Sequence, residues 1–251
     1  MKKKKIFAVV MLLLGIFGGV GLGNHYAVAE QNSSQTRVII GTDNRKQVME
    51  TTKSPYNSIA FIAADGSVGS GAVIGENTIL TAAHVVNSIR DTPEKESVYV
   101  IPARGGSKTP YGKFKVSQIH IFPKYLENSF LSNDMALMII EPLDGKSIGD
   151  VVPPLKFNLV NDLPENTILS TVGYPGDKPW ATMWESLGKA TFVDNNFIEH
   201  NMSTVGGQSG SPVFNTANEI LGVHVGAPRT NVNTATKLNK EKYDFILDHL
   251  Q

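Results

Sequence analysis

Short apolar runs broken by Gly, Pro, Asn and Asp fill the chain from Val38 onward, and they constrain its fold more than any other feature. Many short runs separated by turn residues are typical of a sandwich or barrel built from β-strands. The clearest runs cover residues 59–63, 71–75, 78–81, 97–101, 136–140 and 219–225. The sequence therefore predicts an all-β fold.

One helix is predicted at the C-terminal end of the chain. Apolar residues recur there at the spacing i, i+3, i+4 and i+7 and would share one helix face, namely Tyr243, Ile246, Leu247 and Leu250. Asn239 stands where a side chain can cap the first turn. We expect this helix to pack on the β-structure through its apolar face.

Residues 1–29 have the three parts of a secretory signal peptide. Residues 2–5 are lysines, an apolar run extends from residue 6 to about residue 23, and Ala27-Val28-Ala29 is a small-x-small cleavage site. A retained membrane anchor is the alternative, because the apolar run approaches the roughly 18–20 residues that span a bilayer. Five glycines in the run favour cleavage after Ala29 and a secreted, extracellular product. Residues 30–37 are polar, as expected of a short propeptide.

Charge and cysteine content exclude several classes of function. The chain has 23 basic and 23 acidic residues, and five of the basic and one of the acidic residues precede Val38. The remaining 18 basic and 22 acidic residues give a formal net charge of −4 without a basic stripe, so nucleic acid is not an expected partner. The chain has no cysteine, which excludes a thiol nucleophile, cysteine-ligated zinc and iron–sulfur chemistry.

Ser209 is the central candidate for chemistry, in the segment GGQSGSP (residues 206–212). A serine hydroxyl needs a base to take its proton, and the oxyanion that forms on attack needs hydrogen-bond donors. Flanking glycines allow a tight turn that would aim the backbone N–H groups of Gly207 and Ser209 at one point, as an oxyanion hole. A plain turn between strands is the alternative interpretation, and Ser211 is a second candidate nucleophile.

Two further residues supply the groups that such a serine needs. His84 follows an apolar strand in TILTAAHVV (residues 78–86), and Asp134 begins another in NDMAL (residues 133–137). The histidine can act as the base, and the aspartate can hold its tautomer and stabilise the imidazolium. Each residue alone would be an ordinary strand-end residue. Their order and separations, 50 residues from His84 to Asp134 and 75 more to Ser209, are those of chymotrypsin-type proteases.

The local contexts TAAH, DxAL and GxSGxP add to a resemblance to the chymotrypsin-like superfamily. The chain more closely resembles the staphylococcal V8-type glutamyl endopeptidases, a family that includes the exfoliative toxins. The stretches that carry this likeness are VGYPGDKP (residues 172–179), ATMWES (residues 181–186) and STVGGQSGSPVFN (residues 203–215). The resemblance implies a chymotrypsin-like double six-stranded β-barrel with a C-terminal helix, in a protease domain that covers residues 38–251.

The resemblance also implies the activity. The expected protein is a secreted, monomeric serine endopeptidase that cleaves protein or peptide substrates preferentially after glutamate. It is expected to need no metal or organic cofactor and to have no stable membrane association after signal cleavage. In the family, the substrate carboxylate is recognised by a histidine on the strand after the nucleophile, a threonine before it and the mature α-amino group. By motif position these are His224, Thr204 and Val38. His120 and His200 match no catalytic motif, so we interpret them as structural.

Two positions depart from related patterns. In trypsin-like zymogens the new terminus pairs with an acid directly before the nucleophile, but that residue is Gln208 here. We therefore expect the protein to be a zymogen that cleavage between Arg37 and Val38 activates, and we expect the new terminal amine to have a role in specificity. The family tends to place an aromatic residue after the pocket histidine, where this chain has Val225, so a different pocket wall is expected.

Other functions are left open by the sequence. A narrow-specificity protease similar to the exfoliative toxins would use the same triad on a single folded target. A catalytically inert, protease-fold binding module is a further alternative, although such a protein would usually have lost part of the triad. A quality-control protease with an additional peptide-binding domain is disfavoured, because only 42 residues follow Ser209.

Overall fold

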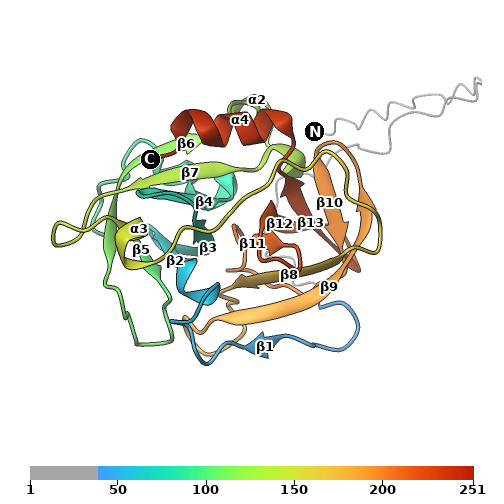
Figure 1. Cartoon of the computed structure of the whole chain (residues 1–251), viewed down its shortest axis with the longest axis horizontal. Coiled ribbons are helices and arrows are strands. Elements are labelled where there is room, and N and C mark those ends of the chain that lie inside the picture. Colours follow the sequence, from blue (N-terminus) through green and yellow to red (C-terminus); the bar gives the residue numbers. More distant parts are fainter. Residues whose placement is uncertain (1–38) are drawn as a thin grey trace, which may run out of the picture. The chain divides into compact units, whose positions relative to one another are not determined.

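A computed structural model of the protein describes residues 39–251 (Figure 1). The predicted signal peptide, the predicted propeptide and Val38 lie outside the described residues. Within them the chain forms two antiparallel β-barrels of six strands each, which confirms the predicted chymotrypsin-like double barrel. No helix in this part of the chain has the length and apolarity that crossing a bilayer would need.

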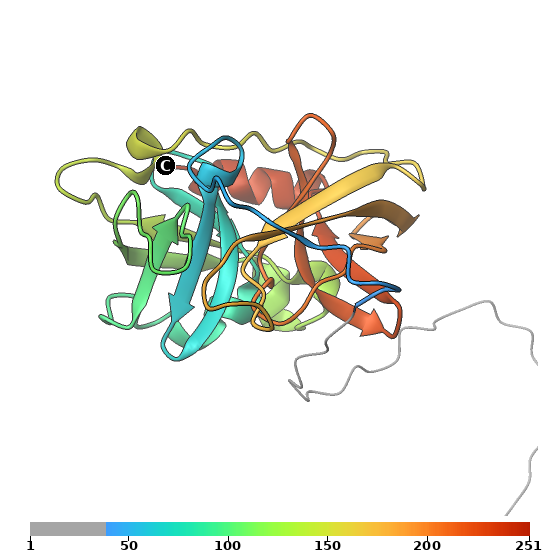
Figure 2. The same cartoon turned by 90° about the horizontal axis from the view of Figure 1, so that it is seen from below.

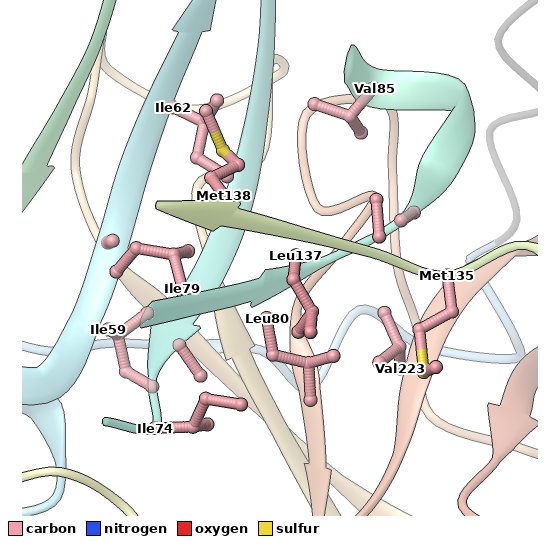
Figure 3. Close-up of a cluster of buried hydrophobic side chains, with 14 of the residues drawn as sticks. Ile59, Ile62, Ile74, Ile79, Leu80, Val85, Met135, Leu137, Met138 and Val223 are labelled. Carbon is pink, nitrogen blue, oxygen red and sulfur yellow. The ribbon is translucent and has the colours of Figure 1, made fainter. Parts of the chain in front are cut away.

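The first barrel closes in the order β2-β3-β4-β7-β6-β5. Its strands are β2 (Ile59–Ala64), β3 (Ser67–Val73), β4 (Thr78–Thr81), β5 (Val98–Pro102), β6 (Phe114–Ile121) and β7 (Ala136–Ile140). The predicted run at residues 78–81 coincides with β4, and that at residues 136–140 with β7. Side chains from these strands fill the interior (Figure 3), among them the fully buried Ile59, Ile62, Ile79, Leu80, Leu137 and Met138. Burying each such side chain stabilises the fold by about 1.5–3 kcal/mol.

The second barrel uses the strands β8 to β13. They are β8 (Ile168–Gly173), β9 (Trp184–Val193), β10 (Phe197–His200), β11 (Pro212–Phe214), β12 (Ile220–Arg229) and β13 (Val232–Lys237). They follow the order β8-β9-β10-β13-β12-β11, and β11 pairs back to β8 to close the ring. The N-terminal strand β1 (Lys46–Gln47) adds to the edge of β9, opposite Glu185 and Trp184.

The helical segments between the strands are short. They are η1 (Tyr56–Ser58), α1 (Ala83–Val86), η2 (Asn87–Ile89), α2 (Pro123–Glu127), η3 (Leu131–Asn133) and α3 (Ile148–Val151). The turns of α1 and η3 matter for the site, because they follow β4 and precede β7. In Figure 2 the strands of the first barrel are cyan to green and those of the second are gold to red.

The C-terminal helix α4 (Lys240–His249) exists as predicted, and the Asn239 side chain caps it by accepting a hydrogen bond from the Lys242 N–H. The predicted contact face is only partly right. Ile246 is buried, but Leu247 is 50% exposed and Leu250 is 37% exposed. The buried residues of the helix are instead Lys242, Phe245 and Ile246. The Phe245 ring lies 5.5 Å from that of Phe122 after β6, so packing on the first barrel selects a stripe rotated from the one that hydropathy predicts.

Candidate active site

His84 and Asp134 are brought together by the pairing of β4 with β7. Thr81 at the end of β4 lies opposite Ala136 at the start of β7. His84 follows that strand end in the first turn of α1, and Asp134 precedes the paired strand as the C-cap residue of η3. Because the strands are antiparallel, both side chains extend from the same end of the pair.

The Asp134 carboxylate contacts His84 at two points. Its Oδ2 lies 2.5 Å from His84 Nδ1, and its Oδ1 accepts a hydrogen bond from the His84 backbone N–H at 2.9 Å. The Asp134 side chain is 3% exposed, whereas that of His84 is 37% exposed, so the imidazole joins a buried carboxylate to a solvent-facing edge. Burial works against the charged imidazolium, but the charge and hydrogen bond of Asp134 outweigh it and raise the pKa of His84.

Ser209 lies in a loop whose backbone requires glycine on both sides. Gly207 has a φ of +96° and Gly210 a φ of +86°, in the region that residues with a side chain rarely adopt. A Cβ at Gly207 would collide with the carbonyl oxygen of Tyr174, and one at Gly210 with that of Ser70. The loop can therefore approach the first barrel closely, and the Ser70 N–H donates to the Ser209 carbonyl at 2.8 Å.

The exposure of the two candidate serines separates them. Ser211 is 0% exposed, while Ser209 is only partly buried. A Cβ at Gly210 would also meet Thr81 Oγ1 and the Ala82 backbone nitrogen, so the residue after Ser209 touches the segment that leads into His84. The fold thus places Ser209, and not Ser211, where a substrate could reach it beside the His84 segment.

Two peptide units of the loop are oriented by their carbonyl groups. The Gly206 carbonyl accepts from the Gly176 N–H at 2.7 Å, and the Gln208 carbonyl accepts from the Ser211 N–H at 3.0 Å. In a trans peptide the N–H points opposite to the C=O. Because the two carbonyl groups point toward Gly176 and Ser211, the N–H groups of Gly207 and Ser209 point away from these partners. Within residues 39–251, neither of these two N–H groups donates to a protein acceptor.

His224 on β12 is anchored directly behind the loop of Ser209. Its carbonyl accepts from the Gly210 N–H and its N–H donates to the Ser211 carbonyl, both at 2.8 Å. Burial, helped by the nearby charge of His84 and opposed by a hydrogen bond with the Thr234 backbone, lowers the pKa of His224 to about 3. Without a bound carboxylate, His224 is therefore neutral at neutral pH and can offer a hydrogen bond but no charge.

Thr204 is 3% exposed and lies in the same stretch as the loop of Ser209. The third predicted recognition group, on Val38, lies outside the described residues. Ile40, two residues further on, donates its N–H to Ser203 Oγ at 3.0 Å. The N-terminal segment is therefore held next to Thr204.

Two buried residues near the site were not identified from the sequence. His200, which we interpret as structural, is 0% exposed, and its ring centroid lies 5.5 Å from that of His224. Its pKa is well below 6.5, mainly because of burial and secondarily because of the charge of His224. Arg45 is buried beside Gln208, the residue before Ser209. Neither has a local sequence signal, because both contacts join segments far apart in the chain.

Comparisons with known proteins agree with this architecture. Residues 69–223 match the family described as trypsin-like peptidase domain. A glutamyl endopeptidase of Staphylococcus epidermidis is 36% identical over 236 residues, which cover 92% of this chain and 81% of that protein. The chain belongs to the glutamyl endopeptidase family. As a member of this family it is a serine endopeptidase that acts on protein or peptide substrates.

Further known proteins are similar to this chain. A glutamyl endopeptidase of Staphylococcus aureus is 33% identical over 226 residues, covering 88% of this chain and 65% of that protein. A solved structure of Glu endopeptidase in complex with MPD has a TM-score of 0.75 at 29% identity and covers 84% of this chain and 98% of its own. The fold is shared by the protease Anisep from Arthrobacter nicotinovorans, which is 19% identical with a TM-score of 0.64. The match covers 80% of this chain and 97% of Anisep.

Proposed function

We propose that this chain is a secreted endopeptidase that cleaves peptide bonds preferentially after glutamate, with His84, Asp134 and Ser209 as its catalytic triad. The observation that carries the proposal is the two-point contact of Asp134 with His84, on the segment that touches the loop of Ser209. This contact fixes both the orientation and the tautomer of the imidazole.

The proposed reaction proceeds through an acyl-enzyme. His84 Nε2 takes the proton of Ser209 Oγ, which attacks the scissile carbonyl, and the N–H groups of Gly207 and Ser209 bind the oxyanion. His84 then gives its proton to the leaving amine as the C–N bond breaks. Water hydrolyses the ester in a second cycle of the same proton transfers. Asp134 stays ionised throughout and stabilises the imidazolium.

Preference for glutamate is supported by the groups beside the nucleophile loop and by the named activity of the relatives. His224 and Thr204 can donate hydrogen bonds to a carboxylate, which a partly dry pocket requires. Ile40 follows Val38 by two residues and donates its N–H to Ser203 Oγ, and this bond supports a role for the Val38 amine as a source of positive charge. A bound carboxylate would also raise the pKa of His224, because the two charges attract.

We expect a matched set of fluorogenic peptides to reveal this preference. The peptides carry Glu, Gln, Asp, Arg or Phe at P1. We expect kcat/KM for Glu to exceed that for Gln by about 100-fold or more, because a neutral amide accepts hydrogen bonds from the pocket donors less well than a carboxylate does. The variant His224→Ala should lose most of the Glu-to-Gln ratio in kcat/KM. The control variant His120→Ala should keep this ratio, because His120 lies on β6, away from the loop of Ser209.

Other results would redirect the assignment. Efficient turnover of another P1 residue would keep the triad and reject the roles of His224, Thr204 and Val38. Absence of turnover on all five peptides, from protein with a cooperative unfolding transition, would favour a narrow-specificity protease or an inert binding module.

We also propose that residues 1–29 are a signal peptide, that residues 30–37 are a propeptide and that the mature, monomeric enzyme begins at Val38. N-terminal sequencing of the protein secreted from the full-length gene should read Val-Ile-Ile-Gly. Protein that retains residues 30–37 should be much less active on glutamyl peptides, because its terminal amine is on Glu30, eight positions before Val38 in the sequence. Equal activity of the two forms would contradict this role of the terminus.

A further inference from the structure

Arg45 is an arginine whose side chain is 0% exposed. Its Nε and Nη2 donate to Asp43, each at 2.9 Å, and its Nη1 and Nη2 donate to Asp177 at 3.0 and 2.7 Å. The guanidinium is thus held by two carboxylates at once, a geometry that its planar fork allows. Its Nη1 also donates to Gln208 Oε1 at 3.3 Å.

Gln208 connects this arginine to the nucleophile loop. The residue is 0% exposed and directly precedes Ser209. Its Oε1 accepts a second hydrogen bond from the Val205 N–H at 3.0 Å, and its own N–H donates to the Val205 carbonyl at 3.1 Å. The side chain therefore spans the loop and closes it into a compact turn.

The same loop carries the two N–H groups proposed for the oxyanion hole. The peptide unit that presents the Ser209 N–H includes the Gln208 carbonyl, and the unit that presents the Gly207 N–H is tied to Gly176. Gly176 is adjacent to Asp177, the second carboxylate that holds Arg45. Arg45 is thus connected to both units, once through Gln208 and once through Asp177.

Arg45 belongs to a segment that is independently fixed to the second barrel. Ile40 bonds to Ser203 Oγ on one side, and on the other side β1 pairs with β9 and the Val48 N–H donates to the Met183 carbonyl at 2.9 Å. Lys178 supports the arrangement by donating to Asp43 at 2.9 Å. The pairing of β1 with β9 thus helps to place the arginine from outside the loop that it contacts.

We propose that Arg45 is a positioning residue that orders the oxyanion-binding loop through Gln208. In trypsin-like zymogens an acid stands at the position of Gln208 and pairs with the new chain terminus, and here the contact of Arg45 with Gln208 replaces that ion pair. This inference rests on the proposed function. Two residues of the N-terminal segment then have different roles. Arg45 affects kcat on every substrate, whereas the amine of Val38 affects only the preference for glutamate at P1. Catalytic competence then requires docking of residues 39–48.

The decisive variant is Arg45→Lys. Lysine keeps a positive charge opposite Asp43 and Asp177, but its single ammonium lacks the fork that also reaches Gln208. We expect kcat to fall about 10- to 100-fold on the Glu and Gln peptides alike, with KM within about 3-fold, because loss of one oxyanion donor costs about 10²–10³ in kcat. Arg104→Lys, at an arginine that donates to the Gly106 carbonyl outside the loop, should leave both constants unchanged.

A second readout separates positioning from general destabilisation. A peptide aldehyde with Glu at P1 forms a tetrahedral adduct, so its inhibition constant should weaken in parallel with kcat/KM. The affinity of the matching cleaved peptide, which does not use the oxyanion hole in this way, should hardly change. Thermal unfolding followed by circular dichroism, together with active-site titration, corrects every rate for the folded fraction.

A double-mutant comparison tests the route through Gln208. Gln208→Ala should reproduce the loss of kcat, and the combination with Arg45→Lys should be no worse than the poorer single variant, because both break the same link. Gln208→Ala also decides the matter if Arg45→Lys does not fold.

Unchanged kcat in either folded variant, a change confined to KM, or fully additive losses would overturn the proposal. Failure of the proposed function would look different, since the unmodified protein itself would then turn over none of the peptides or would prefer another P1 residue.

Discussion

Replacing Ser209 with alanine is expected to lower kcat about 10⁵- to 10⁶-fold on the best glutamyl peptide, as loss of the nucleophile does in other serine proteases. Removing Oγ leaves His84 without a proton to accept and the substrate carbonyl without an attacking group. A small residual rate, about 10³–10⁴ above that in water, should persist because the N–H groups of Gly207 and Ser209 belong to the backbone. Single-turnover kinetics with a fluorogenic peptide measures both quantities.

Ser211→Ala is the matched control for this result. The Ser211 side chain is buried and, within the described part of the chain, its Oγ has no hydrogen-bond partner, so its loss should change kcat by no more than a few-fold. The reverse outcome, with Ser211→Ala inactive and Ser209→Ala active, would show that the assignment of the nucleophile is wrong.

Asp134→Asn should reduce kcat about 10⁴-fold while preserving the fold. The carboxylate now accepts from both the backbone N–H and Nδ1 of His84. An asparagine has one oxygen, which the backbone N–H would retain, and its NH₂ group would then face Nδ1. The imidazole proton would have to move to Nε2, where it blocks acceptance of the Ser209 proton. Steady-state kinetics at pH 8 measures the loss.

The pH dependence of the same pair gives an independent check. The pKa of His84 is raised, and the rate needs its neutral form, so the acid limb of kcat/KM should lie above pH 6.5, the ordinary value for histidine. Activity should fall as the pH drops through that limb. The substrate glutamate titrates near pH 4.3 and does not interfere.

In Asp134→Asn the limb should move to lower pH, because the charge that raises the pKa is gone. Asp65→Asn, which removes an exposed partner of Lys95, serves as the control and should shift neither the limb nor kcat. A limb that stays in place in Asp134→Asn would mean that another group controls the acid side.

Much of the site could be predicted from local sequence. The contexts of His84, Asp134 and Ser209 each include a strand end or a glycine turn, and such features depend on residues that are close in the chain. The runs that became β4 and β7 were found at their observed bounds for this reason. Their antiparallel pairing then follows from closing a barrel, which brings His84 to Asp134.

The helix α4 shows where local pattern becomes insufficient. Its existence and its Asn239 cap were predictable, because both depend on backbone propensity and on neighbours three residues away. Its buried face was not, since Phe122 on the first barrel selects Phe245 as a partner and leaves Leu247 in solvent. Hydropathy ranks side chains, but it does not say which surface they will meet.

The sequence by itself determined an all-β protease domain and the identity and order of its three proposed catalytic residues. Tertiary structure alone decided that Ser211 is buried, that His200 packs behind His224, and that Arg45 holds Gln208. The last pair is separated by 163 positions and Arg45 from Asp177 by 132. Contacts over such separations depend on how two barrels close and meet, and no short stretch of residues encodes them.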